Sequence, residues 1–109
     1  MEYITAQAGE KLLCIEKERV AAILRKPEIW RVPEASEEVL GIAVYGDGLV
    51  VYYRFGGEQE ALCGILVRND GGGIFGIAAA VAGEESLSEE ELEPVMAGTV
   101  NGVWEKKSD

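Results

Sequence analysis

Closely spaced turn signals divide this chain into short apolar runs, and this spacing constrains the fold more than any other feature. Glycine-containing turns are expected at residues 8–10, 45–48, 55–58, 69–73 and 101–102. The runs between them are rich in Val, Ile, Leu and Tyr, and β-branched and aromatic residues are enriched in strands. Short strands separated by frequent turns are typical of an all-β barrel or sandwich. The 109 residues are enough for one such domain, residues 1–109.

Two pairs of runs are predicted to form β-hairpins. Leu49–Phe55 is a nearly continuous strand, and Gly46-Asp47-Gly48 makes it the second arm of a hairpin that starts with Leu40–Tyr45. Leu62–Arg68 and Ile74–Ala82 are predicted to pair across the next glycine-rich turn. The chain should therefore contain little helix.

Two segments have helical features. Local propensity over Glu16–Lys26 favours a helix, because helix formers are common there and an apolar set has i, i+3, i+4 spacing. Farther along, Ser88 and Glu91 have the spacing of a capping box, and Pro94 ends what starts there. We expect one helical turn at this second place.

Charge excludes some partners. The chain has 20 acidic and 10 basic residues, a net charge of −10, whereas nucleic acids and anionic membranes are bound through Lys and Arg. Neither is expected as a partner; the acidity suits solubility or docking of a basic partner. The apolar run 74–82 is too short to cross a bilayer. Residues 1–5 lack the features of a signal peptide, so a cytoplasmic protein is expected.

The chain has no histidine and two cysteines, Cys14 and Cys63, each within an apolar run. The lack of histidine removes the commonest general base and metal ligand. Two distant cysteines without histidine make a poor zinc site. We therefore expect buried, reduced thiols, no metal, no cofactor and no catalytic activity.

The run Gly71–Gly76 fits the pattern G-x-G-x-x-G. In dinucleotide-binding proteins these glycines open a helix that faces a pyrophosphate, but here a short apolar run follows and reaches Gly83 early. We interpret the loop as a hairpin turn and keep small-ligand binding as an alternative. The glutamates at 84–85 and 89–91 lack the spacing of a calcium loop and are interpreted as a solvated face.

The order of motifs along the chain resembles the CheW-like domain, the coupling module of bacterial chemotaxis arrays. The matching stretches are Gly9–Ile15, Val20–Pro33, Gly41–Phe55 and Gly76–Ala80, with a final strand at Gly98–Val103. The single motifs are loose, but their order and spacing extend over nearly the whole chain. The resemblance implies strands at Tyr3–Thr5, Leu12–Ile15 and Val20–Arg25, with a turn and not a helix at Glu16–Arg19.

The resemblance implies a fold of two small intertwined antiparallel β-barrels, each an SH3-like subdomain, that share a hydrophobic seam. Whether the second barrel is complete stays open. The implied function is that of a non-catalytic adapter in chemotaxis-type signalling. Its partners would be a chemotaxis histidine kinase and a chemoreceptor.

Several polar positions depart from the family pattern. Gly46 stands where the family has the Arg of its R-G pair, and Arg54 stands where it has an Asp. Ala22, Val51 and the pair Ala79-Ala80 replace a Glu, a Pro and a V-D pair. The family also continues with a strand and a helix beyond Trp104, so we expect a divergent, shortened member. The apolar positions are kept, which supports the fold more than it supports receptor–kinase coupling.

The residues predicted to bind a partner lie on the expected third strand and on the hairpin. They are Val20, Ile23, Leu24, Val39, Leu40, Ile42 and Arg54. The aliphatic ones could equally be core, whereas Arg54 should point out of it. Trp30 is expected to be packed, and Trp104 could be a core residue or an exposed contact. An alternative function is a homodimeric or partner-binding module outside chemotaxis.

Overall fold

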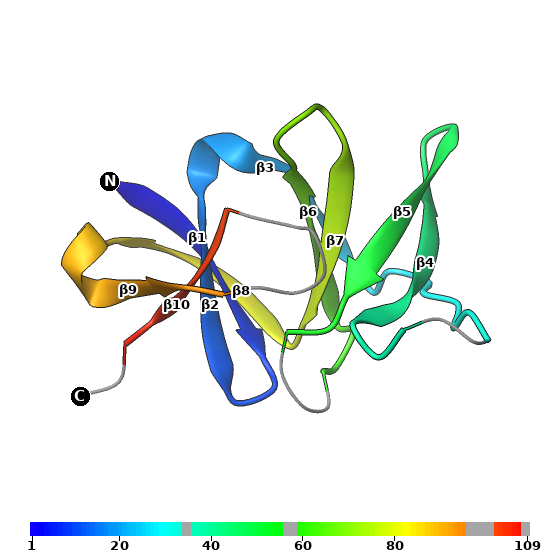
Figure 1. Cartoon of the computed structure of the whole chain (residues 1–109), viewed down its shortest axis with the longest axis horizontal. Coiled ribbons are helices and arrows are strands. Elements are labelled where there is room, and N and C mark those ends of the chain that lie inside the picture. The colour runs from blue at the N-terminus through cyan, green and yellow to red at the C-terminus, as the bar shows by residue number, and fades with distance from the viewer. Residues whose placement is uncertain (34–35, 56–58, 96–101, 108–109) are drawn as a thin grey trace.

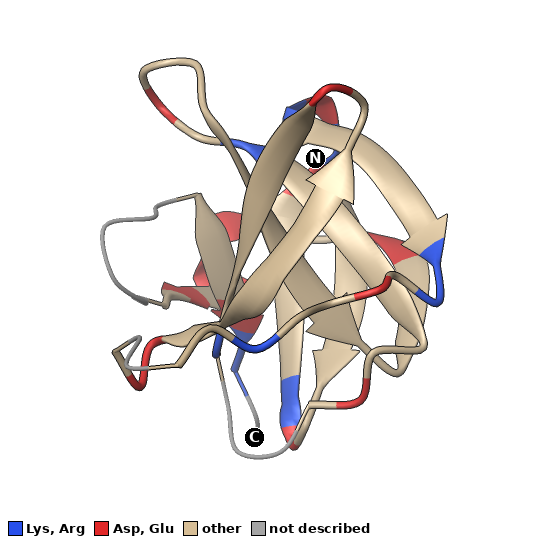
Figure 2. Ribbon diagram, turned by 90° about the vertical axis from the view of Figure 1, so that its right-hand side faces the viewer, with Lys and Arg blue, Asp and Glu red and all other residues tan. Residues whose placement is uncertain are grey.

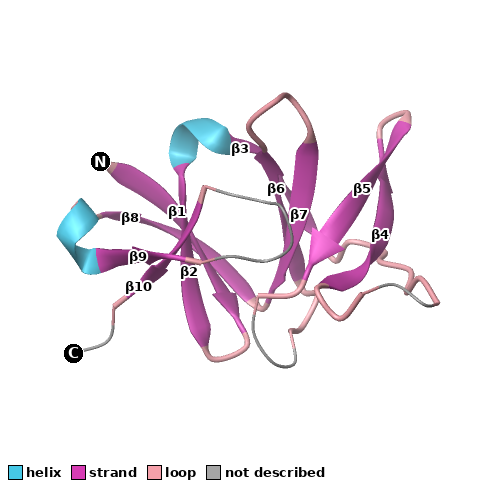
Figure 3. Cartoon of the chain, in the orientation of Figure 1, coloured by secondary structure: helices cyan, strands magenta, loops and turns pink. Residues whose placement is uncertain are grey.

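The computed structural model describes residues 1–33, 36–55, 59–95 and 102–107, which form two five-stranded β-sheets (Figure 1). Sheet A has the strand order β8-β1-β2-β10-β9, and sheet B has the order β3-β6-β7-β5-β4. The strands are β1 (Glu2–Ala8), β2 (Lys11–Glu16), β3 (Val20–Arg25), β4 (Val39–Tyr45), β5 (Gly48–Tyr53), β6 (Cys63–Arg68), β7 (Ile74–Ala79), β8 (Val81–Ser86), β9 (Leu92–Pro94) and β10 (Val103–Lys106). The helical segments of the described residues are two 3-10 turns, η1 (Lys17–Arg19) and η2 (Glu89–Glu91) (Figure 3).

The chain passes between the two sheets twice. It begins in sheet A with β1 and β2, builds all of sheet B from β3 to β7, and returns to sheet A with β8. The return occurs at Ala80, whose N–H donates to the carbonyl of Gln7 over 2.9 Å. The predicted continuous strand Ile74–Ala82 is therefore wrong in its extent, because β7 ends at Ala79 and the following residues pair with β1.

Three apolar clusters organise the two sheets. The largest is the seam, where residues of β1, β2 and β10 in sheet A pack against one face of sheet B. Its members are Ile4, Ala6, Ala8, Leu13, Ile15, Phe55, Ile65, Val67, Phe75, Ile77, Ala79 and Val103. A second cluster lies on the other face of sheet B, around Tyr52 and Leu66. A third lies on the other face of sheet A, around Tyr3 and Cys14.

Local predictions about the hairpin and the turns are confirmed. β4 and β5 pair antiparallel, with Tyr45 opposite Gly48. The segment with helical propensity forms the η1 turn and then β3, which pairs with β6. In η2, Ser88 and Glu91 form the expected capping box. Pairing with β6 overrides the helical propensity of β3, because it gives the backbone hydrogen-bond partners along one edge and places Val20 and Leu24 against the two apolar clusters of sheet B.

Glycines in sheet B make room for one aromatic ring. Tyr52 is fully buried, and its ring lies over Gly76, its partner in the parallel β5–β7 pairing. A Cβ on Gly76 would lie 2.7 Å from three ring atoms of Tyr52, and one on Gly64 would meet the same side chain. These glycines are therefore required by packing.

The glycine-rich loop 69–73 connects two antiparallel strands, as the hairpin interpretation predicted. Gly71 and Gly72 have φ values of 93° and 97°, which L side chains rarely adopt. A strand follows this loop, whereas the dinucleotide fingerprint needs a helix there. Of the predicted final strand Gly98–Val103, residues 98–101 lie outside the described residues. The described strand begins at Val103 and runs to Lys106, so it extends beyond the predicted end of this strand.

Candidate functional site

The arm formed by β4 and β5 extends beyond the rest of sheet B and exposes apolar side chains. β5 pairs with β7 only through Val51–Tyr53, so the turn end of the hairpin projects from the sheet (Figure 1). Val44 and Leu49 lie opposite each other and are 58% and 65% exposed. We call these two, with Ile42, Val51 and Trp30, the hairpin surface.

Trp30 joins the hairpin surface through backbone hydrogen bonds to the edge of β4. The N–H of Trp30 donates to the carbonyl of Ile42 over 2.8 Å, and the N–H of Ile42 donates back over 2.9 Å. The expectation that Trp30 is packed is wrong, since its side chain is 52% exposed. In a strand, the backbone N–H and C=O groups of residue i and residue i+2 point to the same edge. Val44 therefore directs its N–H and C=O outward, where no described residue pairs with them.

A groove of about 420 Å³ lies beside the start of β4. It is lined by Arg31, Val32, Ser36, Glu37, Val39, Leu40 and Arg54. Three of the predicted partner-binding residues, Val39, Leu40 and Arg54, therefore meet here. The Nε of Arg54 donates to the carbonyl of Glu37 over 3.2 Å, and its backbone N–H donates to the carbonyl of Glu38 over 2.7 Å. The predicted strand Leu49–Phe55 ends at Tyr53, and Arg54 directly after it lines the groove at the surface and points out of the core, as expected.

The three predicted residues of β3 differ in exposure. Val20 packs against the seam, and Leu24 packs against the cluster around Tyr52. Ile23 is 49% exposed, on a strand that ends sheet B. Of these three, Ile23 is therefore the residue available to a partner.

The predicted residues do not form one continuous site. β3 and β4 are the two end strands of sheet B, so Ile23 belongs to one edge and the groove and hairpin surface to the other. Sequence reasoning missed Val44 and Leu49 as exposed residues. The sequence feature that could have identified them is their position, one residue before Tyr45 and one residue after Gly48. At the end of a projecting hairpin no neighbouring strand covers such residues.

Charge is sparse on this part of the molecule. Neither β4 nor β5 contains a charged residue, and Figure 2 shows the arm uncharged apart from its turn. Edge strands of soluble proteins are usually protected by charges, prolines or covering segments. Beyond the Trp30 bridge, the outer edge of β4 has none of these among the described residues. An edge of this kind is suited to binding another protein.

The cysteines lie within the two sheets. Cys14 is buried and Cys63 is half-buried, and both are free thiols. Burial raises the pKa of Cys14 to about 11 and also raises the pKa of Cys63, so neither is an activated nucleophile. Within the described residues, no three acidic, Cys or His side chains are grouped to hold a metal. No helix of the described residues is long and apolar enough to span a bilayer.

A solved structure of another protein superimposes on nearly all of this chain. It is the crystal structure of the scaffolding protein TtCheW from Thermoanaerobacter tengcongensis, with a TM-score of 0.69. The match covers 99% of this chain and 82% of that chain, at 20% sequence identity. The chain has a CheW-like fold. The sequence matches no protein-family model and no curated protein.

The CheW-like fold confirms the predicted all-β class and the two intertwined subdomains. It also explains the shared seam, because each sheet contributes one face to it. Two positions that depart from the family pattern can now be placed in the structure. Gly46 lies at the exposed hairpin turn, and Ala79 lies in the seam. Both residues suit these places, because Gly46 has a φ of 60° in the turn and alanine is apolar.

Proposed function

We propose that this chain is a non-catalytic adapter that couples a chemoreceptor to a histidine kinase through protein–protein contacts. The observation that carries the proposal is the pair of apolar edges of sheet B, Ile23 on one side and the hairpin surface on the other, within a fold shared with a scaffolding protein. Two separate surfaces allow one small domain to bind two partners at once. Such an adapter acts in the cytoplasm, where the kinase and the receptor tip lie.

Apolar anchors with a polar rim are the usual basis of such contacts. Exposed Ile23 supplies an anchor on β3, and Val44 and Leu49 supply anchors on the hairpin. The groove beside β4 adds two arginines, Arg31 and Arg54, at the rim. Because the chain is otherwise strongly acidic, these arginines favour a partner that presents carboxylates at this edge.

The substitution Ile23→Asp tests the β3 anchor. Ile23 is half-exposed on an edge strand, so the aspartate can reach water and the variant should fold. The matched control is Val81→Asp on β8, an aliphatic residue 65% exposed on the other sheet. Tagged wild type should co-purify its partner from cells of its own organism, Val81→Asp should do the same, and Ile23→Asp should not. Full recovery of the partner by a folded Ile23→Asp protein would contradict the proposal.

A second candidate is a homodimeric module outside chemotaxis, favoured by the open edge of β4. Two copies could pair their β4 strands antiparallel through the free backbone groups of Val44. Sedimentation equilibrium distinguishes the two candidates. A dimer that Val44→Pro converts to a monomer supports self-pairing, since proline removes the outward N–H. A monomer at all concentrations supports the adapter with foreign partners.

A further inference from the structure

A pocket of about 310 Å³ opens at the face of sheet A that lies away from the seam. It is lined by Tyr3, Glu16, Glu89, Leu92 and Trp104, and we call it the acidic-aromatic pocket. It combines two aromatic side chains and two carboxylates, and none of the described residues that line it is basic. It lies on the sheet opposite to Ile23 and the hairpin surface, so it is separate from the contacts proposed above.

Strand register brings the lining residues together from distant parts of the chain. Tyr3 on β1 lies directly opposite Glu16 on β2, and Trp104 on β10 lies opposite Cys14 on the same β2. Leu92, at 6% exposure, packs in the same apolar cluster as Tyr3 and half-buried Trp104. Aromatic and aliphatic groups therefore form the base of the pocket, and the two glutamates can reach its opening.

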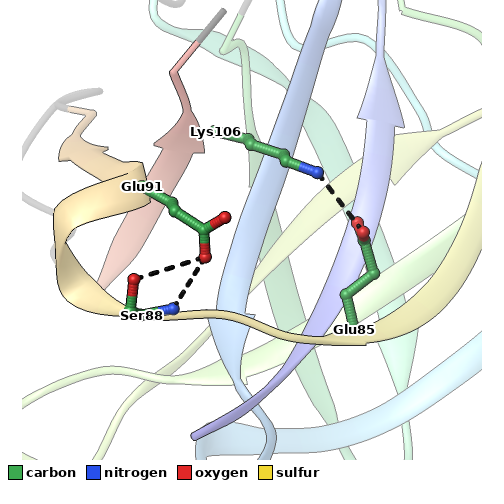
Figure 4. A network of polar contacts seen from close by, with 4 residues as sticks. All are labelled: Glu85, Ser88, Glu91 and Lys106. Atoms are coloured by element: carbon green, nitrogen blue, oxygen red, sulfur yellow. Dashed lines mark hydrogen bonds and ion pairs between the residues drawn. The ribbon is translucent and has the colours of Figure 1, made fainter.

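Other polar groups near the pocket are already engaged (Figure 4). The Ser88 N–H donates to Glu91 Oε2 over 2.9 Å, and the Ser88 hydroxyl donates to the same oxygen over 3.3 Å. This capping box fixes η2, the turn that carries Glu89. Lys106, the nearest cation on β10, pairs with Glu85 at 3.4 Å. The opening is thus formed by an ordered turn, and the adjacent lysine is directed to another carboxylate.

The polar groups of the pocket itself form no hydrogen bond or ion pair between side chains of the described residues. Tyr3 is only 2% exposed, yet within the described part of the chain its hydroxyl makes no hydrogen bond. Neither Glu16 nor Glu89 forms an ion pair with a described residue. Burial first, and then the carboxylates of Glu16 and Glu89, raise the pKa of Tyr3, so both carboxylates lie within electrostatic reach of this hydroxyl. The Tyr3 side chain thus places an unpaired hydroxyl at a pocket with two carboxylates that form no ion pair with a described residue, an arrangement that suits a ligand rich in hydrogen-bond donors.

We propose that the acidic-aromatic pocket binds a positively charged side chain, arginine or lysine, presented by a partner protein. The faces of Tyr3 and Trp104 attract a cation through their ring quadrupoles. The carboxylates of Glu16 and Glu89 accept its hydrogen bonds, and the Tyr3 hydroxyl offers a further acceptor. A hard metal ion is a poorer match, because calcium requires six or more oxygen ligands and the pocket walls are aromatic.

Titration with a small arginine probe tests the pocket directly. The probe is N-acetyl-arginine amide, and the control is N-acetyl-citrulline amide, which has nearly the same shape without the charge. The readout is the indole N–H signal of Trp104 in ¹⁵N NMR spectra, distinguished from that of Trp30 with the variant Trp30→Phe. The arginine probe should shift the Trp104 signal saturably, with a dissociation constant on the order of millimolar, and citrulline should not. An unshifted Trp104 signal, or equal shifts with both probes, would overturn the proposal.

Glutamate variants separate a built pocket from general attraction to an acidic protein. Glu89→Gln and Glu16→Gln should each weaken arginine binding about fivefold, and the double variant should abolish it. The matched control is Glu90→Gln, which removes the same charge from the same turn but does not line the pocket. Its binding should equal that of the wild type. Equal weakening by Glu90→Gln and Glu89→Gln would show that only the overall charge attracts the probe, and would also overturn the proposal.

Discussion

Replacing Gly76 by alanine tests the packing at the centre of sheet B. An added Cβ would lie 2.7 Å from three ring atoms of Tyr52, and the ring is fully buried and so has little room to move. Alanine is normally favoured over glycine within a strand by about 0.5–1 kcal/mol. Overpacking a core costs roughly 1–3 kcal/mol. We therefore expect Gly76→Ala to lower the free energy of unfolding by about 1–2 kcal/mol, against the usual sign of this substitution.

Urea unfolding, followed by circular dichroism, measures this loss, and the melting temperature should fall by roughly 5–10 °C. The matched control is Gly73→Ala in the same glycine-rich run, because a Cβ there meets nothing within 4 Å and the position has no left-handed φ. Removing the ring by Tyr52→Leu should reduce the cost of Gly76→Ala, which a double-mutant cycle detects. If Gly76→Ala is as stable as Gly73→Ala, the packing argument is refuted.

Two further predictions concern buried polar groups. The Tyr52 hydroxyl is buried and has no hydrogen-bond partner among the described residues. Tyr52→Phe should therefore leave the free energy of unfolding unchanged or raise it by up to about 1 kcal/mol in urea titrations; a clear loss would reveal a partner. Burial raises the pKa of Cys14 from 9.0 to about 11, so iodoacetamide at pH 8 should label it slowly in the native protein and fast in urea. Because the unfolded thiol ionises first, the free energy of unfolding should also fall as pH rises from about 9 towards 11. Rapid native labelling would contradict the burial of Cys14.

The sequence was sufficient to predict elements that depend on neighbouring residues. The β4–β5 hairpin follows from its Gly-Asp turn, and η2 follows from the Ser88–Glu91 spacing. It was less reliable where distant residues decide the outcome. The strand Ile74–Ala82 was predicted as continuous because its apolar run is unbroken, but at Ala80 the chain leaves β6 and pairs with β1. Nothing local marks that change of partner.

In the candidate sites, too, the sequence predicts what neighbouring residues determine but not what distant residues determine. Val20, Ile23 and Leu24 could be placed on one strand from sequence, but which of them is exposed depends on how β3 packs against the two apolar clusters. Similarly, the acidic-aromatic pocket joins Tyr3 to Trp104, which are a whole chain length apart. Their proximity results from the pairing of β2 with both β1 and β10, a relation that no motif or spacing expresses.

The most direct test of the adapter function is whether the chain recruits a kinase to a receptor. Membranes carrying the chemoreceptor of the same organism are mixed with its histidine kinase, with and without this chain, and are sedimented. We expect the kinase to sediment with the membranes only when the chain is present, and the chain to sediment with them. Val81→Asp should act like the wild type, whereas Ile23→Asp should leave the kinase in the supernatant. Kinase that sediments equally with and without the chain, or a chain that binds neither partner, would contradict the adapter function.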